Sequence, residues 1–200
     1  FKRFLATYPY SVHRYEAMMR VADCLFTRSY PEALKAYGEV DRAALDLDLR
    51  EDLDYRMAYC LLQVGELDRA ENLFGALAST KRYGAAARFY RGYIAYARGN
   101  YAEAERLFAQ ADTRTAPGDM AEYYLAQIYY RTARYDKAFA SARTLLRRSG
   151  VKPEFTTEAQ RIAGESQYQL GHTAEAIPYL RKYVAAAADP MPSALYILGC

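Results

Sequence analysis

The sequence of 200 residues has no tryptophan, and glycine and proline are scarce, at 11 and 7 residues. Apolar residues make up 52% of the chain and charged residues 26%, a balance that excludes a disordered or collagen-like protein. No apolar run approaches the ~20 residues that a membrane-spanning helix requires. The net charge is only +3 and both signs are mixed along the chain, whereas a nucleic-acid-binding protein concentrates Lys and Arg on one face. The sequence therefore predicts a folded protein with no membrane-spanning segment and no nucleic-acid partner.

The residue types that build metal and catalytic sites are also rare. The two histidines, His13 and His172, are far apart in the sequence, so they are not expected to share a metal ion. The three cysteines, Cys24, Cys60 and Cys200, show no CxxC or Cys/His spacing. Neither a GxGxxG nor a GxxxxGK[ST] phosphate-binding loop is present. These absences predict a protein that is not an enzyme and has no cofactor and no metal site.

What the chain does contain is an internal repeat. Five segments share a small residue, helical apolar spacing, a turn and then an alanine. The alanines are residues 33, 70, 104, 138 and 176, which gives spacings of 37, 34, 34 and 38 residues. A small residue lies eleven positions before the first alanine and twelve before each of the others: Ala22, Ala58, Gly92, Ala126 and Gly164. Small residues on both helices allow two backbones to approach closely, so each segment is predicted to form an antiparallel helical hairpin.

The turn between the two helices of each hairpin carries its own signal. Gly65, Gly99 and Gly171 follow the first helix in three repeats, and glycine supplies the left-handed conformation that ends a helix. Ala133 stands at this place in the fourth repeat. Cys24 and Cys60 occupy equivalent positions of successive first helices, ~8–10 Å apart and beyond disulfide reach. We expect both to be buried as small apolar side chains, and Cys200 to be a free thiol.

A period of 34 residues with this pattern resembles the tetratricopeptide repeat (TPR) family. The resemblance covers nearly the whole chain, although the early tryptophan of the family motif is missing. It implies an all-α fold, a right-handed superhelical α-solenoid of antiparallel helix pairs. Five repeats are expected, with a partial repeat at each end, in a single solenoid over residues 1–200. The predicted full repeats are 12–45, 50–80, 84–115, 118–150 and 155–189, and the partial ones are 1–9 and 191–200.

The N-terminal segment carries a second resemblance. Phe1-x-x-Phe4, followed by Tyr8-Pro9-x-Ser11, is similar to a junction in bacterial cell-envelope TPR proteins, including outer-membrane assembly lipoproteins and the Tol-Pal coordinator family. Pro9 is expected to stop one helix and Ser11 to cap the next. The junction favours the periplasm or cell envelope over the cytoplasm, but it leaves the compartment open. Neither end of the chain has a polar capping helix, so we expect a longer natural protein and end-to-end self-association.

In the TPR family the first helices line the concave face, at the position three before the small residue and at one and four after it. Carried onto this sequence, the rule gives fifteen places, rich in tyrosine. Ten of them form the predicted partner-binding site: Phe26, Tyr55, Tyr59, Phe89, Tyr93, Tyr96, Tyr123, Gln127, Tyr130 and Tyr168. The others are Met19, Asp23, Leu62, Arg161 and Glu165. Tyrosine combines rigid apolar area with a hydroxyl group, the mixture favoured in binding surfaces.

Few charges occur among these places, so the expected partner is an extended or helical peptide or a segment of another protein. Three alternatives remain open. The tyrosines could pack between adjacent first helices, and the chain could be an architectural spacer within a larger envelope protein. A tyrosine-lined carbohydrate-binding site is the third, because aromatic platforms also stack on sugars.

Overall fold

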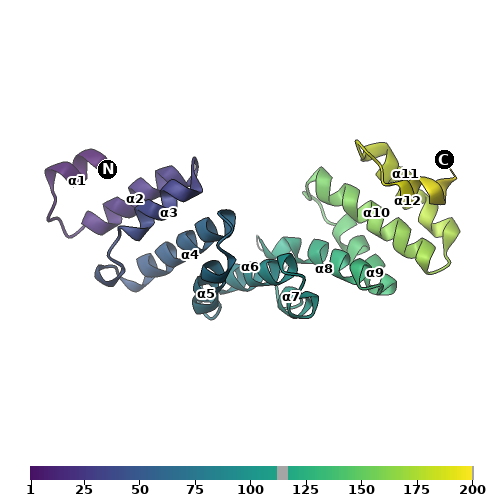
Figure 1. Cartoon of the computed structure of the whole chain (residues 1–200), viewed down its shortest axis with the longest axis horizontal. Coiled ribbons are helices and arrows are strands. Elements are labelled where there is room, and N and C mark those ends of the chain that lie inside the picture. Colours follow the sequence, from purple (N-terminus) through teal and green to yellow (C-terminus); the bar gives the residue numbers. More distant parts are fainter. Residues whose placement is uncertain (112–116, 200) are drawn as a thin grey trace. The chain divides into compact units, whose positions relative to one another are not determined.

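A computed structural model of the chain describes residues 1–111 and 117–199. Within these residues the protein is all-α, with twelve α-helices and no strand, as the sequence predicts (Figure 1). The end of the predicted third repeat, residues 112–115, and Cys200 lie outside the described residues. The chain divides into two compact units, Phe1–Ile94 and Ala95–Cys200, which are treated separately below.

The first unit contains five helices and most of a sixth. They are α1 Lys2–Thr7, α2 Arg14–Phe26, α3 Tyr30–Gly38, α4 Leu47–Gln63, α5 Leu67–Leu77 and α6 Gly84–Ala97, which crosses the unit boundary. A 3-10 turn, Arg42–Ala44, precedes α4. Helix α2 packs against α3, and α4 packs against both α3 and α5, so two complete hairpins are stacked in this unit.

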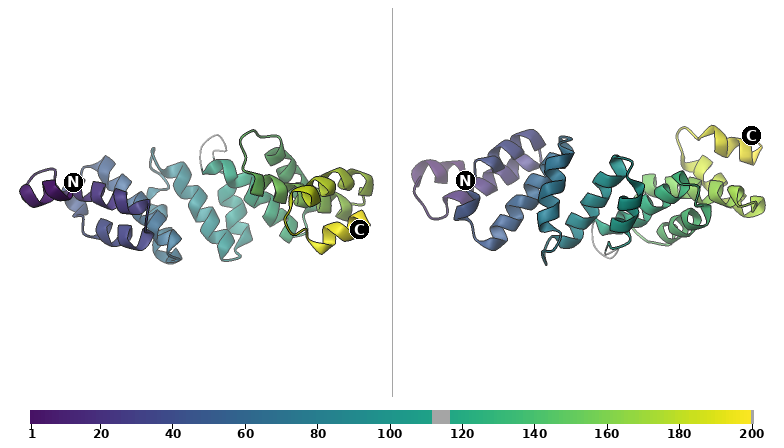
Figure 2. Two further views of the ribbon diagram at one scale, coloured as in Figure 1. Left: turned by 90° about the horizontal axis from the view of Figure 1, so that it is seen from above. Right: turned by 60° about the horizontal axis from the view of Figure 1, so that its bottom comes forward.

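The second unit contains α7 Tyr101–Phe108, α8 Ala121–Arg131, α9 Tyr135–Leu146, α10 Pro153–Gln169, α11 Thr173–Ala186 and α12 Pro192–Leu198. A second 3-10 turn, Gly118–Met120, leads into α8. The pairs α8–α9 and α10–α11 form hairpins, and α9 also packs against α10. Both views of Figure 2 show the green helices between residues 121 and 186 side by side.

Small residues hold the two helices of each hairpin close together. Ala22 and Ala58 in the first helices, and Ala33 and Ala70 in the second, are fully buried. Gly164 of α10 shows how tight the contact is: a methyl group at its α-carbon would lie 2.5 Å from Leu180 Cγ of α11. Such a distance is a steric clash, so any larger residue here would force the Leu180 side chain or α11 to shift.

The turn between the helices adopts the left-handed conformation that the glycine pattern predicts. Gly65, Gly99 and Gly171 have φ angles of 84°, 76° and 82°. Ala133 occupies the same turn with a φ of 56°. A left-handed conformation is costly for a residue with a β-carbon, so Ala133 is a strained position.

Two expectations about local structure need correction. Cys24 is exposed, whereas Cys60 is buried as predicted. Cys60 packs in the core between the first and second hairpins, but the equivalent face of α2 is covered only by the short helix α1. Ser11 accepts a hydrogen bond from the amide of His13 at 3.2 Å, and α2 begins later, at Arg14, with His13 as its N-cap. The serine therefore stabilises the turn before the helix.

Candidate protein-binding site

The first helices of the first unit carry a continuous cluster of aromatic rings. Phe26 of α2 lies 5.5 Å from Tyr59 of α4, measured between ring centroids, and Tyr59 lies 5.5 Å from Tyr90 of α6. Tyr55 stacks on Tyr83 at 4.3 Å. Each ring contact of this kind contributes roughly 0.5–1.5 kcal/mol beyond the area it buries. The rings therefore tie successive repeats together.

A polar contact lies beside this aromatic cluster. Asp23 of α2, one of the fifteen places derived above, accepts a hydrogen bond of 2.6 Å from the Tyr37 hydroxyl. It also forms ion pairs with Arg20 at 3.2 Å and with Arg56 of α4 at 3.3 Å. Asp23 thus bridges α2, α3 and α4, and its carboxylate is already satisfied within the protein.

In the second unit the first-helix residues are joined by hydrogen bonds as well as by ring contacts. The Tyr96 hydroxyl at the end of α6 donates to Gln127 Oε1 on α8. Tyr123 of α8 packs edge to face on Phe155 of α10, with 4.8 Å between the ring centroids. Gln127 therefore lies at the junction between one first helix and the next.

An ion-pair cluster occupies the first-helix face of α10. Arg161 binds Glu158 through two hydrogen bonds, of 2.9 Å from Nε and 2.6 Å from Nη2, and it also pairs with Glu165 through Nη1. Its guanidinium lies 5.2 Å from the centroid of the Tyr130 ring. Ser193 at the start of α12 donates to Glu165 Oε1 at 2.5 Å. The buried Glu165 carboxylate therefore connects α10 to α12.

A cavity of about 410 Å³ opens between α8, α10 and the start of α12. The residues that line it are Gln127, Tyr130, Arg131, Glu158, Arg161, Ile162, Glu165, Met191 and Ser193. This volume is in the range of ligand-binding pockets. Gln127 and Tyr130 come from the predicted partner-binding site, and Arg161 and Glu165 from the remaining first-helix places.

The environment shifts the pKa values of the aromatic hydroxyls upward. Burial, reinforced by a hydrogen bond to Glu165, raises the pKa of Tyr130 to about 12. Burial also raises the pKa values of Tyr55, Tyr59 and Tyr123. Burial alone would lower the pKa of Arg161, but its contacts with Glu158 and Glu165 outweigh that effect and raise it. At neutral pH these tyrosines are neutral hydrogen-bonding groups and Arg161 is a cation.

Nine of the ten predicted partner-binding residues are half-buried. Each presents part of its side chain to solvent while the rest packs within the fold. Phe89 differs, because it is only 4% exposed and its ring lies in the interior. The structure thus shows packing roles for many of these side chains, as in the first alternative above, and leaves nine of them accessible in part.

Several residues of the second-unit cavity were not anticipated as site residues. Glu158 and Arg131 line the cavity but lie outside the three positions per helix that the family rule selects. Met191 immediately precedes α12 and Ser193 lies in its first turn, a helix to which the rule was not applied. The spacing of Glu158, Arg161 and Glu165, three and then four residues apart, is a sequence signal for side chains that share one helix face. Nothing in the local sequence predicts that Ser193 reaches Glu165, because 28 residues separate them.

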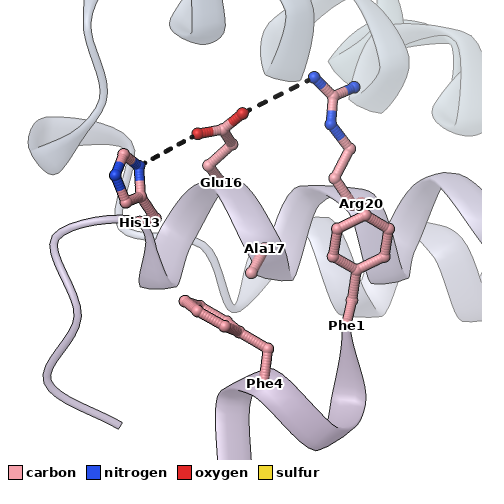
Figure 3. Close-up of a pocket in the computed structure, with 6 residues that line it drawn as sticks. All are labelled: Phe1, Phe4, His13, Glu16, Ala17 and Arg20. Atoms are coloured by element: carbon pink, nitrogen blue, oxygen red, sulfur yellow. Dashed lines mark ion pairs between the residues drawn. The ribbon is translucent and has the colours of Figure 1, made fainter. Parts of the chain in front are cut away.

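A second cavity, of about 570 Å³, lies at the N-terminal end of the first unit (Figure 3). Phe1 and Phe4 face Ala17 of α2 across it, Glu16 and Arg20 lie along the same helix, and His13 is its N-cap. His13 Nδ1 is 3.5 Å from Glu16. None of the ten predicted partner-binding residues lines this cavity.

The part of the chain that the structure describes holds no group of three or more His, Cys, Asp or Glu side chains arranged to bind a metal ion. Within residues 1–111 and 117–199, no helix combines the length and the apolar character needed to cross a membrane.

Comparison with known proteins defines the class of fold. MamA from AMB-1 superimposes with a TM-score of 0.66 and 20% identity, over 85% of this chain and 87% of MamA. A tetratricopeptide repeat protein from Parabacteroides merdae gives a TM-score of 0.65 and 17% identity, over 99% of this chain and 75% of that protein. A putative kinesin light chain of Podospora anserina with nearly identical TPR-like repeats gives a TM-score of 0.62 and 15% identity, over 88% of this chain and 96% of that protein. No curated protein matches the sequence.

These neighbours share the helical-hairpin solenoid architecture. Tetratricopeptide repeats in general serve as scaffolds for protein–protein interaction. The sequence itself matches the tetratricopeptide repeat family over residues 55–120 and 123–192. Since this match covers more than half of the chain, the protein belongs to the tetratricopeptide repeat family, as its repeat spacing predicts.

Proposed function

We propose that the protein is a non-catalytic scaffold that binds a peptide or a protein segment on the face formed by its first helices. The contact residues in the first unit are Phe26, Tyr55, Tyr59 and Tyr93. In the second unit they are Tyr96, Tyr123, Gln127, Tyr130 and Tyr168. Phe89 is buried and packs on the Tyr90 ring, with 5.5 Å between the ring centroids, so it is not among the contact residues.

One observation carries the proposal. Four residues that were selected only by their spacing from a small residue line one cavity: Gln127 and Tyr130 on α8, and Arg161 and Glu165 on α10. A surface of part-buried aromatic rings with hydroxyl and amide groups binds peptides through apolar contact and hydrogen bonds together. Because the rings are already held by their neighbours, little side-chain entropy is lost when a partner binds.

The test uses peptides selected from a library of random sequences for binding to the intact chain. Tyr59→Leu in the first unit and Tyr96→Leu in the second each remove a ring and a hydroxyl from the proposed face. Tyr179→Leu is the matched control, because Tyr179 is a part-buried tyrosine on the second helix α11. Affinity is measured by fluorescence polarisation, and circular dichroism checks that each variant is folded.

We expect at least one of the two face variants to bind the selected peptides about tenfold more weakly, the size of an ordinary interface hot spot. The control should bind like the wild type. Equal affinities for all the variants, each of them folded, would show that peptides bind elsewhere.

A further inference from the structure

A groove between the second helices α3 and α5 of the first unit lies outside the proposed first-helix face. Its volume is about 450 Å³, and helix α4, which packs against both second helices, forms its floor. The residues that line it are Pro31, Leu34, Lys35, Gly38, Met57, Val64, Glu66 and Arg69. None of the ten predicted partner-binding residues is among them.

The floor of this groove is apolar and accessible. Leu34 of α3, Met57 of α4 and Val64 at the C-cap of α4 are half-buried, so part of each side chain faces the groove or solvent. Pro31, at the start of α3, is exposed. Apolar surface left in contact with water in a concave place favours an apolar side chain that covers it.

In the second unit, aromatic rings of the chain itself occupy the surface between two second helices. Phe139 of α9 packs edge to face on Tyr179 of α11, with 5.7 Å between the ring centroids. The Arg143 guanidinium lies 5.9 Å from the centroid of the Phe139 ring. The surface between two second helices of this protein therefore accommodates an aromatic ring beside a cation.

The first unit has smaller residues at the same three places. Counted from the alanine of each repeat, Leu34, Leu73 and Gly38 stand where the phenylalanine, the tyrosine and the arginine stand in the second unit. A methyl group at the α-carbon of Gly38 would meet no atom within 4 Å. The chain thus supplies no ring of its own here, and the groove between α3 and α5 stays open.

The charged rim of the groove is positive on balance. Arg69 forms an ion pair with Glu66 at 2.6 Å, so these two charges cancel. Lys35 is exposed and forms no ion pair with any acid of residues 1–111 and 117–199. The three charged groups that line the groove therefore sum to one positive charge, which favours a carboxylate and the electron-rich face of an aromatic ring.

We propose that the groove between α3 and α5 is a docking site for an acidic segment of another protein, which inserts a phenylalanine or tyrosine ring. The ring lies on Leu34, Met57 and Val64, and a neighbouring carboxylate of the segment pairs with Lys35. This site is separate from the first-helix face, so the failure of either proposal leaves the other standing.

The experiment is an NMR titration of the intact chain, labelled at its methionine, leucine and valine methyl groups. The probe is the peptide acetyl-Gly-Phe-Glu-Gly-amide. Two matched probes have alanine in place of phenylalanine or glutamine in place of glutamate. Lys35→Gln removes the charge from the protein, and Lys182→Gln is its control, because Lys182 is an exposed lysine on the second helix α11.

We expect the methyl signals of Met57 and Val64 to shift saturably, with the roughly millimolar affinity of a single inserted side chain. Loss of the ring from the probe should weaken binding at least about tenfold, because the ring supplies most of the buried apolar area. Loss of either charge should weaken it about two- to fivefold, as for an exposed ion pair. Lys182→Gln should have no effect.

Two further variants fill the groove. Leu34→Phe gives α3 the ring that α9 has, and it should weaken binding of the probe at least about tenfold. Because Leu34 also packs against the core, Gly38→Leu provides a second block, from a residue with open space beside it. Circular dichroism checks that each variant is folded.

Unchanged affinity in both folded blocking variants would overturn the proposal, as would equal binding of the alanine probe. If the Met57 and Val64 signals instead shift with protein concentration in the absence of any probe, a second copy of the chain occupies the groove and the proposal is wrong.

Discussion

Replacement of Ala133 by glycine should stabilise the protein, although it removes a methyl group. Ala133 adopts a φ of 56° in the turn between α8 and α9, where three other repeats have glycine. The left-handed conformation costs a residue with a β-carbon roughly 1–2 kcal/mol. Glycine avoids that cost but loses about 0.5–1 kcal/mol more conformational entropy on folding. The side chain of Ala133 is exposed, so no packing is lost, and the net gain should be about 0.5–1 kcal/mol.

Urea denaturation followed by circular dichroism measures the change in the unfolding midpoint. Since repeat proteins can unfold in more than one step, amide hydrogen exchange in α8 and α9 provides a local readout. Gly171→Ala is the matched control in the same unit, because Gly171 has a φ of 82° and open space where the new β-carbon would lie. It should lower stability by a similar amount. A lower midpoint for Ala133→Gly than for the wild type would refute the strain argument.

Three further predictions concern packing, thiol reactivity and pH. Gly164→Ala should destabilise the α10–α11 hairpin by about 1–3 kcal/mol, because the new methyl group clashes with Leu180. In a protein that already carries Leu180→Ala, the same Gly164→Ala substitution should cost less stability. Urea denaturation measures both changes. Cys24 is exposed and should react with an alkylating reagent in the native state. Cys60 should react only on unfolding, because it is fully buried and burial raises its pKa to about 11. Mass spectrometry of the digested protein locates the label. The pKa of Tyr130 is raised to about 12 in the fold, so the unfolded chain loses this proton first and stability should fall between about pH 10 and 12. The midpoint of urea denaturation against pH tests this, and Tyr130→Phe should reduce the slope.

The helical hairpins could be predicted from the sequence because their constraints are local and repeated. A small residue and an alanine twelve positions apart specify the close contact within a hairpin, and Gly65 or Gly171 specifies the turn. The same spacing selected Gln127 and Tyr130, which the structure brings to one cavity.

Other features depend on contacts that no local pattern describes. Cys24 and Cys60 occupy equivalent positions, yet one is exposed and the other buried, because different neighbours cover them. Glu165 is satisfied by Ser193 from the following repeat, so its burial follows from the packing of α12 on α10. Phe89 satisfies the same spacing rule as Tyr93 but is turned into the interior.

The central claim is that the part-exposed tyrosines of the first helices hold a partner segment. The most direct measurement is an NMR titration of the chain with ring-labelled tyrosine, using a library-selected peptide. The account predicts that the signals of Tyr59, Tyr96 or Tyr130 shift in proportion to peptide occupancy, while the signal of Tyr179 on α11 does not. Saturable shifts at Tyr179, with those three tyrosines unaffected, would contradict it.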